Sequence, residues 1–160
     1  MRRLALCALA ACSAPALTPS PTLSRVSVFA ADARAVDLAA LAAGRPIVVD
    51  LFATWCEACR DNLAPMNELA RAHATGDLVV IGVDVGEPRA IADRFAAREG
   101  ISYPVYTDPE MRFEDSLGTT ALPLVLVIDG QGRIAHRSAR LDAETLEVIR
   151  GLSRTTAEAR

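Results

Sequence analysis

The chain has 160 residues, 17 basic and 20 acidic, so its formal net charge is −3, and 51% of its residues are hydrophobic. This length and apolar content favour one domain with its own core over general disorder. All 17 basic residues are arginine, which excludes a lysine Schiff base and a Walker-type phosphate lysine. The acidic balance argues against a nucleic-acid partner, and no apolar run approaches the ~20 residues of a membrane-spanning helix.

The chain begins with the layout of an export signal. A charged start, Met1 to Arg3, precedes an apolar run from Leu4 to Ala11 that is too short to cross a bilayer. This run leads into Leu9-Ala10-Ala11-Cys12, which resembles a bacterial lipobox. We therefore expect residues 1–11 to be a lipoprotein-type signal peptide and Cys12 to carry lipid. An ordinary signal peptide, cut near Ala10 or Ala31, is the alternative.

A proline-rich stretch follows the predicted signal. Pro15, Pro19 and Pro21 lie among Ser, Thr and Ala, so residues 12–25 are expected to form a flexible tether rather than a helix. A lipid and a tether would hold the next domain on a membrane surface, not through it. We predict that this domain spans residues 26–152 and that 153–160 form a C-terminal tail.

Strand-like and helix-like segments alternate along that domain. The β-branched run Ile47 to Phe52 predicts a strand, the helical spacing of apolar residues from Cys59 to Ala70 predicts a helix, and Leu78 to Val85 predicts a second strand. Strand, helix and strand in this order make a right-handed βαβ unit with parallel strands. Because the apolar runs are continuous, both faces of the sheet should be covered.

The remaining segments complete an α/β fold. Val26 to Phe29 is expected to add an edge strand. Further on, the sequence predicts a helix with Pro88 in its first turn and Gly100 as its stop, a strand at 103–107, a short helix at 110–117, a strand at 124–128, an antiparallel return at 133–138, and a last helix capped by Asp142. The expected architecture is a central mixed β-sheet flanked by helices.

Two of the four cysteines remain available for chemistry in the domain. Cys7 lies in the predicted signal and Cys12 is assigned to lipid, which leaves Cys56 and Cys59 in a Cys-x-x-Cys pair. A structural zinc site needs four ligands, and the two histidines lie far from this pair in sequence, so no metal is expected. A purely structural disulfide is also disfavoured, because closing so small a loop would stabilise the fold little.

The position of the pair indicates redox chemistry. Cys56 falls where a strand passes into a helix, and a helix N-terminus favours a thiolate, the nucleophile of disulfide exchange. Cys59 follows one turn later, so its sulfur should lie near that of Cys56. We expect Cys56 to be the more exposed nucleophile and Cys59 to resolve the mixed disulfide. The dithiol itself carries the electrons, so no cofactor is predicted.

Two motifs carry a family resemblance. Val49-Asp50-Leu51-Phe52-Ala53-Thr54-Trp55-Cys56-Glu57-Ala58-Cys59 resembles the active-site segment of the thioredoxin superfamily. With Arg60 and Pro65 it is similar to the TlpA/ResA-like group of exported thiol:disulfide oxidoreductases. Ala121 to Gly130 resembles the family's cis-proline loop and following strand. The resemblance implies a thioredoxin-like fold over about residues 26–152, with a β-α insertion between Asp84 and the cis-Pro loop.

The sequence departs from the group at three positions. Ala58 stands where many relatives carry Pro, which could change local rigidity and reduction potential. Asp50 matches the buried acid of thioredoxin, whereas the TlpA-like group often has Asn. Leu122 precedes Pro123 where several relatives have a β-branched or small residue, so the substrate-facing surface could differ.

The other candidate residues each have a functional and a plain interpretation. Burial would raise the pKa of Asp50 and let it pass protons to and from Cys59; otherwise it faces the surface or binds a backbone group. Trp55 would shield the disulfide and contact partners, or simply pack. Glu57 would raise the pKa of Cys56, or be an exposed charge without a role. The resemblance implies a cis Pro123 that pairs with an extended substrate.

The leading interpretation is a monomeric, membrane-tethered thiol:disulfide oxidoreductase outside the cytoplasm, acting by resemblance more as a reductant than as an oxidant. Its substrates would be exported proteins with disulfides, such as apocytochrome c, and a membrane thiol reductase would supply electrons. A copper-binding module of the same fold is the alternative, because thiolates suit Cu(I). No third ligand is evident in the sequence, and stoichiometric Cu(I) binding that is lost in His136→Ala would support this alternative. A peroxiredoxin-type peroxidase is disfavoured because the dithiol replaces its single peroxidatic cysteine.

Overall fold

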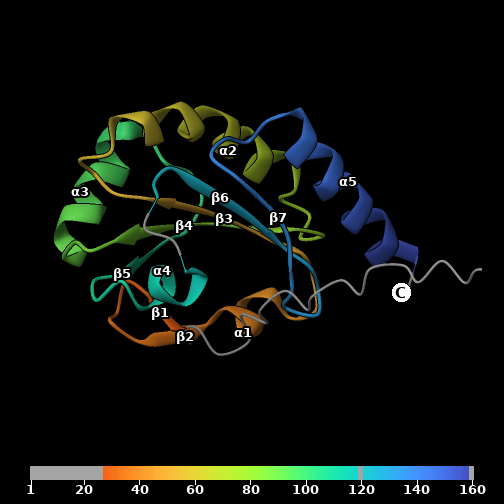
Figure 1. Ribbon diagram of the computed structural model, residues 1–160, viewed down its shortest axis with the longest axis horizontal. Helices are drawn as coiled ribbons and strands as arrows, with labels where there is room; N and C mark the ends of the chain where they lie inside the picture. Colours follow the sequence, from red (N-terminus) through yellow and green to blue (C-terminus); the bar gives the residue numbers. More distant parts are fainter. Residues whose placement is uncertain (1–26, 119–120, 159–160) are drawn as a thin grey trace, which may run out of the picture.

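The structure is a computed structural model that describes residues 27–118 and 121–158. The predicted signal peptide, Cys12 and the tether at 12–25 lie outside the described residues. In chain order the elements are β1 (Ser27–Phe29), β2 (Ala35–Asp37), α1 (Leu38–Ala42), β3 (Ile47–Phe52), the 3-10 turn η1 (Glu57–Cys59), α2 (Arg60–Ala72), β4 (Val79–Val85), α3 (Arg89–Glu99), β5 (Val105–Asp108), α4 (Arg112–Leu117), β6 (Leu124–Ile128), β7 (Ile134–Ser138) and α5 (Ala143–Glu158) (Figure 1).

The strands form a seven-stranded mixed sheet in the order β2-β1-β5-β4-β3-β6-β7. The central strands β3, β4 and β5 are parallel, while β6 runs antiparallel to β3 and β7 antiparallel to β6. The predicted βαβ unit and mixed sheet are therefore confirmed. β5 and α4 stand between α3 and β6, which is the β-α insertion that the resemblance implied before the cis-Pro loop.

Helices cover both faces of this sheet. In Figure 1, α2, α3 and α5 lie on one side of the strands and α1 and α4 on the other. Alternate residues of the central strands divide between two core clusters, with Val49 and Ile81 in one and Val48 and Val80 in the other. This is the reason that the strands read as continuous apolar runs.

The N-terminal part of the sheet differs from the prediction. Val26 to Phe29 was expected at an edge, but β1 lies inside the sheet because β2 pairs with its outer side. The elements β2 and α1 were not predicted, since three and five residues are too short to show a period.

Other boundaries are shifted by local packing. The strand predicted at 103–107 begins at Val105, after Pro104, so Tyr103 belongs to the preceding loop. Pro88 is the N-cap of α3 rather than part of its first turn, and Gly100 ends the helix with a positive φ as predicted. The last helix, α5, continues to Glu158, beyond the predicted domain boundary at Leu152. Among the described helices, none has the length and apolarity to cross a bilayer.

Candidate functional site

Cys56 and Cys59 form a disulfide at the end of β3. Their Cα atoms are 5.4 Å apart, and the backbone N–H of Cys59 donates to the carbonyl of Cys56 at 3.2 Å. Cys56 is 7% exposed and Cys59 is 1% exposed. The expected order of exposure is therefore found: the first cysteine is the more accessible and the second lies deeper in the core.

The chain reaches this disulfide through a tight strand-to-helix turn. After β3 ends, the N–H of Cys56 donates to the carbonyl of Ala53 at 3.0 Å, and Cys56 becomes the N-cap of η1, which leads directly into the 13-residue α2. Cys56 therefore lies at a helix N-terminus, as predicted. The unpaired N–H groups and the helix dipole there favour a thiolate when the disulfide is reduced.

The surface around Cys56 combines exposed and apolar groups. Trp55 is 72% exposed, and Glu57 and Ala58 are also exposed. The Leu122–Pro123 peptide bond is cis, as the resemblance implied. Since Leu124 at the start of β6 pairs with Leu51 near the end of β3, the cis-Pro loop lies at the same end of the sheet as the disulfide.

Asp50 is buried within β3. It has no exposed surface, and burial raises its pKa to about 7, although hydrogen bonding from Tyr103 and Asn62 opposes that rise. The Tyr103 hydroxyl donates to Asp50 Oδ2 at 3.0 Å, whereas Oδ1 has no hydrogen-bond partner. The predicted burial and raised pKa are found, and the surface-facing alternative is wrong.

Sequence reasoning missed Tyr103 and Asn62 as neighbours of Asp50. Asn62 lies in α2, where its Nδ2 donates to the carbonyl of Ala139 at 3.0 Å and its Oδ1 accepts from the N–H of Leu141 at 3.2 Å. One signal was available, because an isolated glycine inside a strand, here Gly82, indicates that another group approaches the backbone closely.

A second buried acid lies near the site. Asp84 in β4 has no exposed surface, and burial and the neighbouring Glu87 raise its pKa to about 8. Glu87 in turn accepts from the N–H of Thr54 at 2.5 Å and from its hydroxyl at 2.8 Å. Thr54 is two residues before Cys56, so Glu87 ties the loop after β4 to the loop that carries the disulfide. In the sequence, Asp84 was indicated only as a polar residue that interrupts the apolar run from Leu78 to Val85.

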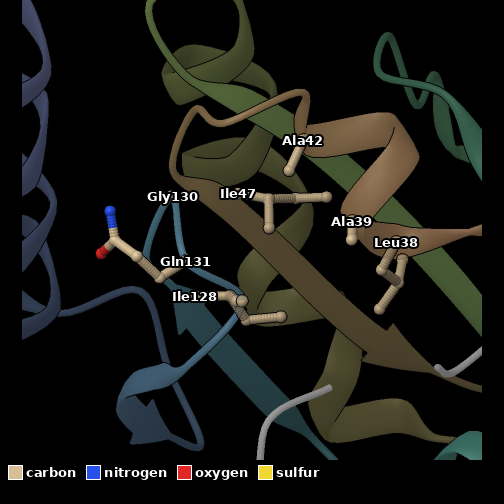
Figure 2. A pocket seen from close by; sticks show the side chains of 8 residues that line it. Leu38, Ala39, Ala42, Ile47, Ile128, Gly130 and Gln131 are labelled. Atoms are coloured by element: carbon tan, nitrogen blue, oxygen red, sulfur yellow. The ribbon is translucent and has the colours of Figure 1, made fainter. Parts of the chain in front are cut away.

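A small apolar pocket lies away from this chemistry. It is lined by Leu38, Ala39 and Ala42 of α1, by Ile47 and Ile128, and by the turn at 130–132 (Figure 2). Ile47 is the first residue of β3, whereas Cys56 follows its last. The pocket is therefore at the opposite end of the sheet and is not part of the site.

The histidines occupy separate places. His73 is the C-cap of α2, with its Nδ1 3.0 Å from the carboxylate of Asp77. His136 lies in β7, paired with Val127. Within residues 27–118 and 121–158, no group of three or more His, Cys, Asp or Glu side chains is placed to hold a metal ion. The further ligand that the copper-binding alternative requires is therefore not found beside the two cysteines there.

Curated proteins with similar sequences carry thiol-disulfide names. The chain is 29% identical over 91 residues to the thiol-disulfide oxidoreductase ResA of Geobacillus thermodenitrificans, an alignment that covers 57% of this chain and 52% of that protein. It is 36% identical over 93 residues to a DsbE homolog, a thiol:disulfide interchange protein of Paracoccus denitrificans, covering 58% and 49%. The chain thus spans about half the length of these curated relatives.

Solved structures share the fold. A thiol:disulfide interchange protein of the thioredoxin family from Chlorobium tepidum has a TM-score of 0.69 at 23% identity, covering 86% of this chain and 99% of that one. StoA from Bacillus subtilis has a TM-score of 0.65 at 14% identity, covering 79% and 97%. These similarities confirm the predicted thioredoxin-like fold.

A family model adds the evidence that covers most of the chain. The Redoxin model matches residues 11–149, a span that includes the disulfide, both buried acids and the cis-Pro loop. Together with the fold and the Cys-x-x-Cys turn, this match shows that the chain belongs to the Redoxin family.

Proposed function

We propose that the chain is a thiol-disulfide oxidoreductase in which Cys56 and Cys59 alternate between a dithiol and a disulfide. The observation that carries this proposal is the bridged pair itself, with its more exposed cysteine at a helix N-terminus. A thiolate there can attack a disulfide, and a second thiol one turn away can complete the exchange.

The reaction proceeds in two exchanges. The Cys56 thiolate attacks a substrate disulfide, forms a mixed disulfide and releases one substrate thiolate. Cys59 then gives its proton to Asp50, and its sulfur attacks Cys56, re-forming the internal bridge and releasing the second substrate thiolate. Two electrons pass from the protein to the substrate, and a thiol reductant must return them.

Substrate contact is assigned to the surface around Cys56. Trp55 offers an exposed apolar face, and the cis Leu122–Pro123 bond holds the next loop at the same end of the sheet. We assign Glu57 and Ala58, both exposed between the cysteines, to tuning the reduction potential.

The proposed setting is outside the cytoplasm. The reductive direction, exported substrates such as apocytochrome c, a membrane thiol reductase as electron donor, and lipid anchoring through Cys12 rest on the sequence resemblance. A Cys12→Ser variant of the full chain should leave the membrane fraction for the soluble fraction. If it stays with the membranes as firmly as the wild type, the anchor assignment is wrong.

The activity is tested by trapping. In a background with Cys7→Ser and Cys12→Ser, the reduced protein should reduce a small aromatic disulfide. Cys59→Ser should accumulate a mixed disulfide through Cys56, and the matched variant Cys56→Ser should accumulate none. A wild-type rate from Cys56→Ser would contradict the assignment. Repeating the trap with a peptide that carries an oxidised Cys-x-x-Cys-His haem site tests the substrate class.

A further inference from the structure

We propose that Tyr103 is a positioning residue whose hydroxyl holds one oxygen of Asp50 and leaves the other oxygen free to exchange a proton with Cys59. This inference rests on the proposed function and deepens it, because it assigns the proton step to one atom of the carboxyl group.

The two oxygens of Asp50 have different surroundings. Oδ2 accepts a hydrogen bond from the Tyr103 hydroxyl at 3.0 Å, whereas Oδ1 is buried and has no hydrogen-bond partner. A buried carboxylate oxygen without a partner is costly. A carboxyl oxygen in this position is explained if Oδ1 acquires a proton during turnover, and we assign that proton to Cys59.

The backbone on both sides of Tyr103 is fixed. Before it, the N–H and hydroxyl of Ser102 both donate to Asn67 Oδ1 of α2 at 2.7 Å. After it, the carbonyl of Pro104 accepts from the N–H of Gly82 in β4 at 2.9 Å. Tyr103 is therefore held between the helix that follows the disulfide and the strand that lies beside Asp50.

Gly82 provides the room for this arrangement. It lies opposite Asp50 in the β3–β4 register. A Cβ atom at Gly82 would lie 3.0 Å from Cε1 of Phe52 and 3.0 Å from Cε2 of Tyr103. The missing side chain lets the tyrosine ring lie over β4, from where its hydroxyl reaches Asp50 on β3.

Among the groups around Asp50, the Tyr103 hydroxyl donates to it at 3.0 Å, and the amide of Asn62 also lowers the pKa of Asp50. On β6 its partner is Val125, which is apolar, and on β4 it is Gly82, with the buried acid Asp84 two residues further on. From α2, Asn62 faces it as an uncharged amide that is already held by backbone groups. Cys59 is the N-cap of that helix, and its thiol is the group to which we assign the proton. Burial and Asp50 raise the pKa of Tyr103, so the phenol stays protonated and can only donate here.

The proton step then balances at named atoms. The Cys59 Sγ–H bond breaks and its proton goes to Asp50 Oδ1. The electron pair left on Cys59 Sγ forms the bond to Cys56 Sγ, and the bond between Cys56 and the substrate breaks, releasing a substrate thiolate. Throughout, Oδ2 keeps its hydrogen bond from Tyr103.

The test measures Asp50 itself. The infrared carbonyl band of protonated Asp50, identified by its absence in Asp50→Asn, is followed against pH in wild type and Tyr103→Phe. Loss of the hydrogen bond should raise the midpoint by about one pH unit, because that bond favours the carboxylate. Tyr106→Phe, which removes the chain's other phenol, is the matched control and should leave the midpoint unchanged. An unmoved midpoint in folded Tyr103→Phe, or an equal shift in Tyr106→Phe, overturns the proposal.

A second measurement does not depend on the folding of Tyr103→Phe. Since the chain has 2 tyrosines, incorporating 3-fluorotyrosine into Tyr106→Phe labels Tyr103 alone. The more acidic phenol is a stronger donor and should lower the Asp50 midpoint. A midpoint that stays in place or rises overturns the proposal.

A double variant links the hydrogen bond to the reaction. Tyr103→Phe should shift the pH profile for resolution of the mixed disulfide upward, and that shift should vanish in the Asp50→Asn background. A shift that persists in Asp50→Asn shows that Tyr103 acts by another route. Absence of any disulfide exchange in the wild type would instead refute the proposed function, while the infrared titration would still read the Tyr103–Asp50 contact.

Discussion

Two buried acids on neighbouring strands have different groups around them. Asp50 on β3 and Asp84 on β4 are both inaccessible to solvent, and burial raises their pKa values to about 7 and about 8. They differ in what faces them. Asp50 receives a hydrogen bond from the neutral Tyr103 hydroxyl, whereas Asp84 has no partner for either oxygen and lies near the carboxylate of Glu87.

The comparison shows that the neighbour, and not burial alone, decides what a buried acid can do. A neutral donor stabilises the carboxylate and brings the pKa of Asp50 near neutrality, where a proton can be taken up and given back. A nearby anion has the opposite effect on Asp84, which therefore keeps its proton at neutral pH. Glu87 itself accepts two hydrogen bonds from Thr54.

The largest contrast is expected in the rate of disulfide exchange. Asp50→Asn removes the proposed proton acceptor and should slow resolution of the mixed disulfide at neutral pH by about 10–100-fold, somewhat less than typical general-base effects because water can substitute. Asp84→Asn, the matched control, should change the rate little, since Asp84 is already uncharged. Stopped-flow measurement of the released substrate thiol reads both rates, and equal slowing in the two variants would remove the distinction between the acids.

The next effect is on stability. In Gly82→Ala the new Cβ would crowd the rings of Phe52 and Tyr103 at 3.0 Å, so the free energy of unfolding should fall by about 1–3 kcal/mol, as overpacking commonly costs. Gly151→Ala is the control, because a Cβ there meets nothing within 4 Å. Denaturant unfolding compares the two. We also expect the Asp50 midpoint to rise in Gly82→Ala; a fully stable variant with an unmoved midpoint would contradict the close packing over Gly82.

The pH dependence of thermal stability separates the two acids. Each has a folded pKa above its unfolded value, so the folded state holds a proton that the unfolded state loses. The stabilising contribution is complete below the unfolded pKa of about 3.9 and is lost as pH rises through the folded values of about 7 and about 8.

Above the midpoint of Asp50, only Asp84 should still contribute to the decline in stability. Replacing either acid by Asn should therefore raise Tm more at about pH 9 than at about pH 5, by a few degrees. The decline should end near pH 7 in Asp84→Asn, where only Asp50 remains, and near pH 8 in Asp50→Asn, where only Asp84 remains. Melting curves recorded from about pH 5 to about pH 9 test this expectation. A gain in Tm that is larger at acid pH would contradict the assigned upward direction of the pKa shifts.

The smallest effect is expected from Glu87→Gln. The neutral amide removes the like charge beside Asp84, so the pKa of Asp84 should fall towards its ordinary value, while the amide oxygen still accepts from Thr54. The high-pH limb of the Tm profile should move to lower pH, whereas the Asp50 infrared midpoint should stay in place. If the Asp50 midpoint moves as far as the Asp84 limb, the two acids form one coupled unit.

Local signals in the sequence predicted much of this protein. The Cys-x-x-Cys turn, the βαβ unit and the helix stop at Gly100 follow from hydrophobic periodicity and from residues whose backbone preferences act within a few positions. The cis bond before Pro123 followed from the resemblance alone. The burial of Asp50 was expected because apolar residues surround it in a continuous strand.

The tertiary structure alone decided the partners of the buried acids and the edge of the sheet. Asp50 and Tyr103 are 53 positions apart, and Thr54 and Glu87 are 33 apart. Such pairs depend on the register between β3 and β4, and the Asp50–Tyr103 pair also depends on the missing side chain at Gly82, over which the Tyr103 ring packs; periodicity does not encode either feature. The strand β2 forms the edge because it pairs with one side of β1, whose other side pairs with β5. Composition and spacing determine which groups are buried, whereas strand register determines which of them meet.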